Sequence, residues 1–270
     1  MVRISSGRNL LSEPSDSSAE DASLIFSTSQ DSKNSLKING GWISFFHTFF
    51  ALSAFFSALI IGSKLHFLKI VKNEYYGYPD EWFPSVSASI GDRYPERNIF
   101  QILIALTCPF RLLLLFLWMY TTKYQVSSSR FKKSPVVLFV IGFVRTVTCG
   151  GWVYITSTDD HNIHDITMIS YIVLTLPYMI MSTSSGKKLS YLSKINPPLA
   201  KKALKYRKIT GFLFFGIIIP LIYFFLQHKI YKVAGEWSLI ILDVLFDAIS
   251  IYEFSAIEMS ISTTSGFNSE

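Results

Sequence analysis

Apolar residues in this chain come in long, nearly unbroken blocks, without the spacing of 3.6 or 2.0 residues that marks amphipathic helices and strands. A helix needs roughly 20 mainly apolar residues to cross about 30 Å of hydrocarbon, and six blocks approach that length. These blocks are residues 43–62, 99–120, 136–156, 166–182, 209–226 and 238–257. The pattern therefore predicts an all-α fold, a polytopic membrane helix bundle with about six transmembrane helices.

Composition supports this class and shows which blocks fit it least well. Half of the residues are apolar, 23 are Phe, and the mean hydropathy is +0.34, values that are unusual for a soluble domain of this length. The fourth block is the shortest. The sixth carries Asp243, Asp247 and Glu253, so its charges need partners inside the bundle.

The segment before the first block has a different composition. Residues 1–36 contain eleven serines and few aromatic residues, so they cannot bury enough apolar surface to fold alone. We expect three regions: a disordered Ser-rich cytoplasmic tail over 1–40, a six-helix transmembrane domain over 41–258, and a short cytoplasmic tail over 259–270.

Lys and Arg residues are shared unevenly between the connections, and short positive loops stay on the cytoplasmic side of a membrane. The N-terminal segment and the second and fourth connections hold 16 of them, whereas the alternate connections hold 7. Both termini are therefore expected to be cytoplasmic. One local signal disagrees, since the Lys residues just beyond the first block outnumber those just before it. The positively charged residues lie in the connections beside the blocks, so the net charge of +6 indicates contact with lipid head groups and not nucleic-acid binding.

The first lumenal connection carries the most distinctive stretch, YYGYPDEWFPSVSASIGDRYPER, at residues 75–97. It is too long for a plain turn, and its two aromatic-Pro segments suit a membrane interface. Two interpretations stay open. The stretch is either an interfacial loop packed on the bundle or a polar site for a lipid head group.

Three segments of this chain resemble one known family. The string PSVSASIGDRYPER, followed by Arg111 in the second block, is similar to the signature of the post-GPI-attachment-to-proteins factor 2 family (Frag/DRAM/Sfk-like). STDDHNIHD at 157–165 resembles the family's second lumenal loop, and KVAGEWSLIILD at 232–243 resembles its entry into the last span. The spelling of the first motif looks especially like that of the fungal members, which include the N-terminal membrane region of the fungal GPI-anchor lipid remodelase.

The resemblance implies a role in remodelling the lipid of glycosylphosphatidylinositol (GPI) anchors in the endoplasmic reticulum or Golgi membrane. In animal members this means reacylation of a lyso-GPI intermediate, and in fungal members it means exchange towards ceramide. The implied partners are the lipid of GPI-anchored proteins and ceramide or an acyl donor. The fungal protein also carries a larger endonuclease/exonuclease/phosphatase-like region that is missing from this sequence, so a separate catalytic subunit is expected.

Charged residues inside the blocks are the first candidates for chemistry. Arg111 and Arg145 lie near the centres of their blocks, where a charge costs roughly 2.5 to 3.5 kcal/mol, so both should face the bundle interior. Asp243 and Asp247 lie one helical turn apart and are the obvious counter-charges. The arrangement is either a set of structural ion pairs or a site for a phosphate or a developing charge.

His161 and His164 share an expected acidic loop with Asp160, and a His beside a carboxylate can act as a general base. Most loop histidines are merely solvated, but the resemblance favours His164. The expected catalytic residues are therefore His164, Asp160 and Asp243. His47, in the first block, is expected to be a hydrogen-bonded packing residue.

Substrate binding is expected at the lumenal face and beside it, through Ser85, Ser87, Asp92, Arg97 and Arg111. No G-x-S-x-G motif is present, and both cysteines fall inside blocks, so the sequence predicts neither a serine-hydrolase site nor a disulfide or zinc framework. No cofactor is expected. Two other classes of function stay open: a transporter or channel would explain the buried charges, and a non-catalytic lipid-binding scaffold would explain the missing catalytic motif.

Overall fold

The computed structural model describes residues 2–5, 35–72, 82–91, 93–125, 134–187, 196–226 and 232–262, and most of these residues are helical. The helices are α2 (Gly41–Leu65), α3 (Phe67–Ile70), α4 (Val86–Gly91), α5 (Glu96–Gln125), α6 (Ser134–Tyr154), α7 (His161–Lys187), α9 (Pro197–Leu226), α10 (Lys232–Ala248) and α11 (Ser250–Phe254). The strands are β1 (Val2–Ser5), β2 (Ser35–Asn39) and β3 (Glu258–Ser262).

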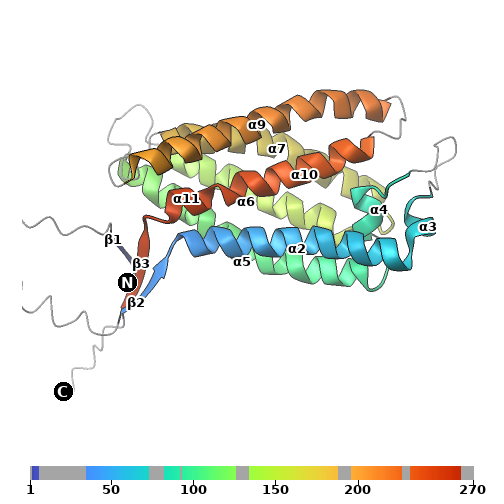
Figure 1. Ribbon diagram of the computed structural model, residues 1–270, viewed down its shortest axis with the longest axis horizontal. Helices are drawn as coiled ribbons and strands as arrows, with labels where there is room; N and C mark the ends of the chain where they lie inside the picture. Colours follow the sequence, from blue (N-terminus) through green and yellow to red (C-terminus); the bar gives the residue numbers. More distant parts are fainter. Residues whose placement is uncertain are drawn as a thin grey trace, which may run out of the picture.

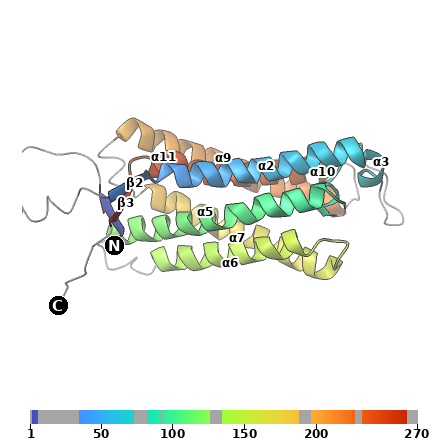
Figure 2. The same cartoon turned by 90° about the horizontal axis from the view of Figure 1, so that it is seen from below.

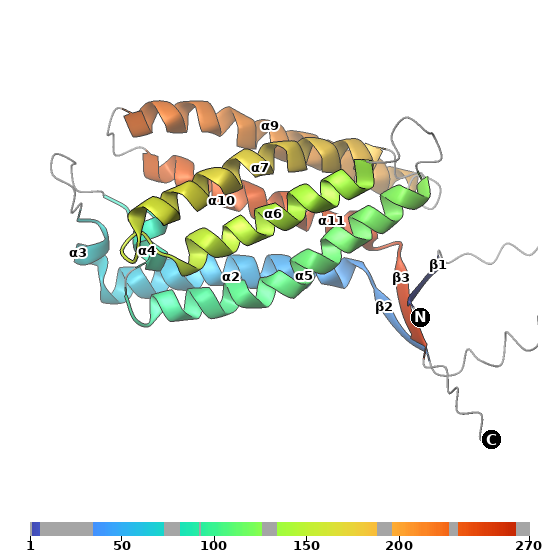
Figure 3. The same ribbon diagram turned by 180° about the vertical axis from the view of Figure 1, so that it is seen from behind.

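The long helices run side by side as one elongated bundle (Figure 1), which is also clear from below (Figure 2) and from behind (Figure 3). The helix pairs α2 and α5, α6 and α7, and α9 and α10 make the most extensive contacts. The three strands lie beyond one end of the bundle, and α3 and α4 lie at the other. We call these the sheet end and the α4 end.

Five helices in the described part of the chain, α2, α5, α6, α7 and α9, are long and apolar enough to cross a membrane. Only 22% to 33% of the most apolar window in each is buried within the protein. Large apolar side chains therefore cover the outside of the bundle as well as its core, for example Phe212 at 77% and Ile219 at 75% exposure. Such a surface is stable only in lipid, which confirms the predicted all-α membrane bundle.

The sixth predicted block, 238–257, is divided between α10 and α11, with Ile249 between them. Two side chains donate hydrogen bonds to backbone carbonyl groups near this break. Ser44 Oγ donates to the Asp247 carbonyl at 2.9 Å, and Arg207 Nη1 donates to the Phe246 carbonyl at 3.3 Å. Together α10 and α11 cover residues 232–254, about 35 Å of helix. The pair thus runs the length of the bundle although α10 alone has 17 residues.

A small antiparallel sheet brings the two ends of the chain together. Its strand order is β1-β3-β2, and the register places Lys37 opposite Ser260. Strand β2 precedes α2 and β3 follows α11, so the chain enters and leaves the bundle at the same end. The chain therefore runs along the bundle an even number of times. Strands β1 and β2 lie in the tail that was expected to lack structure, where β3 supplies the pairing partner; residues 6–34 are outside the described residues.

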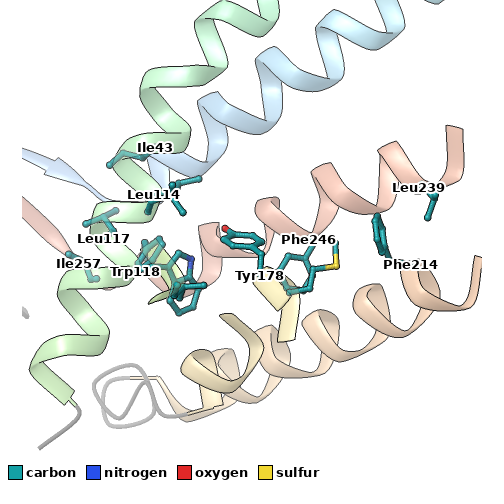
Figure 4. Close-up of a cluster of buried hydrophobic side chains, with 13 residues drawn as sticks. Ile43, Leu114, Leu117, Trp118, Tyr178, Phe214, Leu239, Phe246 and Ile257 are labelled. Carbon is teal, nitrogen blue, oxygen red and sulfur yellow. The ribbon is translucent and has the colours of Figure 1, made fainter. Parts of the chain in front are cut away.

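The core near the sheet end is apolar and tightly packed. Figure 4 shows Trp118 from α5, Tyr178 from α7, Phe214 from α9 and Phe246 from α10 converging in one cluster. Small residues allow close helix contacts elsewhere, since a Cβ atom added to Gly142 of α6 would lie 2.3 Å from Leu115 Cδ2 of α5. Close approach through small residues is the usual basis of helix packing in membranes.

Candidate functional site

Within the stretch 75–97, residues 86–91 form the short helix α4 at the α4 end of the bundle, while residues 75–81 lie outside the described residues. Ser85 Oγ accepts a hydrogen bond from Ala88 N at 3.2 Å and so caps α4. Trp237 Nε1 donates to the Pro84 carbonyl at 3.0 Å, which ties the segment to α10. Ser85 therefore has a structural partner, whereas Ser87 on α4 is half-buried. Asp92, the expected polar contact beyond α4, lies outside the described residues.

An ion pair joins this segment to the second motif. Arg97 Nη2 lies 2.5 Å from Asp159 Oδ2, and Arg97 Nη1 donates to Asp159 Oδ1 at 3.3 Å. These bonds from Arg97, with the backbone and side chain of Thr156, hold the pKa of the Asp159 carboxyl below its ordinary value. The two motifs, about 60 residues apart in sequence, are thus fixed to one another.

The expected loop histidines belong to a helix, because α7 begins at His161. Asp160 precedes it, and Asp160 Oδ1 accepts a hydrogen bond from Ile163 N at 3.0 Å, as an N-terminal cap does. His161 is exposed and its Nε2 lies 3.4 Å from Asp165 Oδ2. An acidic cap stabilises the first turn of a helix, so the acids of this segment favour helix and not loop.

His164 is the buried member of this group, at 3% exposure. Its Nδ1 lies 2.9 Å from the Ile155 carbonyl. Since a carbonyl only accepts, Nδ1 carries the proton and Nε2 is left as an acceptor. This Nε2 is buried and has no hydrogen-bond partner in the described residues. His164 therefore has one ring nitrogen without a hydrogen-bond partner among the described residues, while the Asp160 carboxylate caps the first turn of α7.

Deeper in the bundle, Arg145 is the centre of an ionic cluster. Its Nη2 donates to Asp243 Oδ1 and, at 2.8 Å, to the Tyr171 hydroxyl, while Nε donates to Thr175 Oγ1 at 2.8 Å. Its Nη1 lies 3.5 Å from Asp247 Oδ2. The predicted counter-charges of Arg145 are confirmed. Asp243, expected to be catalytic, also accepts from the Tyr171 hydroxyl, so each of its two carboxylate oxygens has a protein partner.

Arg111 has a different environment, although it lies on the neighbouring helix α5. Its Nε donates to His47 Nε2 at 3.2 Å, and its guanidinium carbon lies 6.0 Å from the centre of the Tyr171 ring. The expected counter-charges Asp243 and Asp247 form their direct ion pairs with Arg145, and they act on Arg111 only from a greater distance. His47 is buried and hydrogen-bonded, as expected.

A second buried ion pair lies near the sheet end. Arg207 Nε and Nη2 donate to the two carboxylate oxygens of Glu253 at 2.7 and 2.5 Å, and Nη2 also donates to Ser250 Oγ at 2.8 Å. The guanidinium lies between the rings of Trp118 and Phe246, 4.9 and 4.6 Å from their centres. Charge counting had placed Arg207 in a cytoplasmic loop, but α9 begins at Pro197 and buries it.

The expected site residues thus fall into two groups. Ser85, Ser87, Arg97, Asp160 and His164 lie at the α4 end, and Arg111 and Asp243 lie inside the bundle. Sequence reasoning missed Tyr171, Thr175 and Tyr178, which share one face of α7. Their spacing of four and three residues was a usable signal. Within the described residues, no group of three or more His, Cys, Asp and Glu side chains could hold a metal ion.

An elongated helix bundle with an apolar outer surface and buried ion pairs defines a polytopic membrane protein. The chain belongs to the family described as the Frag1/DRAM/Sfk1/Cwh43P N-terminal domain, which it matches over residues 39–257. This confirms the family resemblance seen in the motifs.

Three curated relatives illustrate the range of the family. Protein cwh43 of Schizosaccharomyces pombe is 41% identical over 243 residues, which cover 87% of this chain and 23% of that protein. Post-GPI attachment to proteins factor 2 of Caenorhabditis briggsae is 23% identical, with 70% of this chain and 75% of the relative covered. The Drosophila pseudoobscura pseudoobscura protein of the same name is 24% identical, with 66% and 72% covered. No solved structure matches the chain. These relatives mark it as a GPI-anchor-related membrane protein.

Proposed function

We propose that this protein is a GPI-anchor lipid remodelling factor of the secretory-pathway membrane, acting in exchange or reacylation of the anchor lipid and in fungi towards ceramide. The observation that supports it best is the Arg97–Asp159 ion pair. This pair joins two of the three segments whose sequences carry the family resemblance, so these two motifs form one surface at the α4 end. A surface built from both motifs is what recognition of one head group requires.

Charge counting supports the orientation of this surface. With both termini in the cytoplasm, the α4 end faces the lumen, which is the side on which GPI-anchored proteins carry their glycan. A phosphoinositol head group needs cationic and hydroxyl partners, and Ser87 and Arg97 are at that end. His164 is the candidate general base, because its Nε2 has no hydrogen-bond partner within the part of the chain that the structure describes, while Asp160 and Asp243 are engaged by protein groups. We propose that the endonuclease-like subunit, when present, supplies the remaining catalytic groups.

Mass spectrometry of GPI-anchor lipids tests this function directly. Cells lacking this chain should accumulate unremodelled anchors, and restoring it, with the endonuclease-like chain where needed, should return the normal lipids. Unaltered anchor lipids in the deletion would end the remodelling proposal.

Two histidines on the first turn of α7 provide a matched pair of variants in the same assay. His164→Gln should lower the remodelled fraction at least tenfold, because a glutamine cannot act as a base. His161→Gln should leave it unchanged, since that side chain is exposed at the helix start. Equal activity of both variants at equal protein level would remove His164 from the mechanism.

The buried charges favour a transporter as the second candidate, but their pairing counts against it. Arg145, Asp243 and Asp247 are bonded to one another, and a charge held by several bonds is a poor carrier. Ion or proton flux through liposomes containing the purified chain would support the transporter, and a tight seal would support remodelling.

A further inference from the structure

His66 and Glu96 form an acid–base pair at the α4 end that has no part in the proposed function so far. His66 Nδ1 lies 2.7 Å from Glu96 Oε1. The Glu96 side chain is 1% exposed, whereas the His66 ring keeps 22% of its surface accessible. The carboxylate therefore lies inside the protein, and the imidazole lies between it and the surface.

The backbone fixes the positions of both residues. His66 lies between α2 and α3, where its N–H donates to the Gly62 carbonyl at 2.8 Å and its carbonyl accepts from Lys69 N at 2.8 Å. Glu96 is the first residue of α5 and belongs to the motif PSVSASIGDRYPER. The pair thus joins the end of α2 to the start of α5.

A purely structural role explains only part of this arrangement. An acid in the first turn of a helix stabilises the helix start, and it can do so at the protein surface. Glu96 is buried instead, and its Oε2 has no hydrogen-bond partner among the described residues. Burying a carboxylate is unfavourable unless a cation balances it. Within the described part of the chain, the cation in reach of Glu96 is the protonated imidazole of His66.

The bond from Nδ1 to the carboxylate leaves Nε2 of His66 for another partner. A protonated imidazole carries a hydrogen on each nitrogen, so Nε2 is a donor. His161 at the same end differs, because its partner Asp165 is itself exposed and lies 3.4 Å away. A buried carboxylate on one nitrogen and an accessible second nitrogen is the arrangement of histidines that transfer protons in enzymes.

Remodelling moves two protons by either of its routes. A hydroxyl of the acceptor lipid attacks an ester carbon in reacylation, or a phosphorus in exchange, and loses its proton, while the oxygen that leaves must gain one. His164 is the candidate for the first transfer, and the second has no residue assigned to it. His66 suits the second transfer, because its pair with Glu96 holds a proton before the reaction starts.

We propose that His66 is the general acid of remodelling and that Glu96 is the residue that positions it and keeps it protonated. The acceptor hydroxyl gives its proton to His164 Nε2 as its oxygen forms the new bond. The bond to the leaving oxygen breaks, and that oxygen takes the proton from His66 Nε2. Water then carries the proton from His164 back to His66. The inference rests on the proposed function and adds two residues that the family resemblance does not assign.

Anchor remodelling in detergent-permeabilised microsomes, followed by mass spectrometry as a function of pH, tests the assignment. In the wild type the rate should decline at high pH, where the general acid loses its proton. His66→Gln should lower the rate at least tenfold at neutral pH and remove that decline. Glu96→Gln keeps the shape of the pair but not its charge, so it should move the decline to lower pH. His161→Gln is the matched control and should keep the wild-type rate and profile.

Three results would overturn the proposal: a wild-type rate in His66→Gln, a rate lowered equally at every pH in both variants, or no decline at high pH in the wild type. The second result is what a structural pair predicts, and failure of both variants to accumulate leads to the same conclusion. If deletion of the chain alters the anchor lipids while His66→Gln does not, only this inference fails and the proposed function stands.

Discussion

Arg145 and Arg111 are the same residue type at similar depth on neighbouring helices, yet their surroundings differ in kind. Arg145 is bonded to two side chains of α7 and two carboxylates of α10, so its donors are used within the protein. Arg111 is hydrogen-bonded to the neutral His47 ring and to Cys149, and it has no direct ion pair among the described residues. Depth and residue type therefore do not reveal what a membrane arginine does; its partners do.

The largest effect that tests this comparison is expected at Arg145. Arg145→Ala leaves Asp243 and Asp247 buried without a cation, which should cost about 3–5 kcal/mol of unfolding free energy. Thermal unfolding of the purified protein in detergent measures it. Asp243→Ala should be similarly damaging, because it removes the other half of the same pair. Should Arg145→Ala unfold at the wild-type temperature, the cluster is not what holds α6, α7 and α10 together.

A smaller effect on stability is expected at Arg111. Arg111→Gln loses hydrogen bonds to His47 and Cys149 but breaks no direct ion pair among the described residues, so the unfolding free energy should fall less than in Arg145→Gln. The matched control Arg145→Gln should be the less stable of the two variants. If Arg111→Gln destabilises as much as Arg145→Gln, the two arginines share one structural role.

The smallest effect is expected at the exposed pair of the α4 end. The pKa of Asp159 is lowered, so the pair with Arg97 contributes fully above the ordinary carboxyl pKa of about 4 and is lost only as the pH falls through the lowered value. Unfolding temperature should therefore not change through this pair between pH 7 and pH 5.5, and Arg97→Ala should shift it little at either pH. A marked loss of stability at pH 5.5 in the wild type but not in Arg97→Ala would contradict this.

Hydropathy located the spans well and the helix ends poorly. The segment predicted at 209–226 is the apolar part of α9, but the helix begins twelve residues earlier at Pro197. Hydropathy reports where lipid begins, whereas the helix continues through a basic stretch that also buries Arg207. The break at Ile249 was equally hidden, since it depends on bonds from Ser44 and Arg207, far away in the sequence.

The sequence also identified the charged residues of the site but not which of them pair with one another. Asp243 and Asp247 could be recognised as counter-charges from their depth and spacing, but which arginine they pair with depends on how α5 and α6 are rotated about their axes. The same rotation places Tyr171 and Thr175 around Arg145. At the α4 end, the acidic composition of 159–165 suggested a loop, although Asp160 uses its carboxylate to start a helix.

The position of Arg145 and its partner along the chain has a consequence for biosynthesis. Asp243 follows Arg145 by 98 residues, so at about 5–20 residues per second the ribosome delivers it roughly 5–20 s later. Throughout that interval α6 carries a cation with neither carboxylate available, at a cost of roughly 2.5–3.5 kcal/mol in the membrane. The nascent protein is therefore in its most vulnerable state just before α10 is made, and that is when a membrane chaperone or a degradation pathway has its best opportunity to act on it.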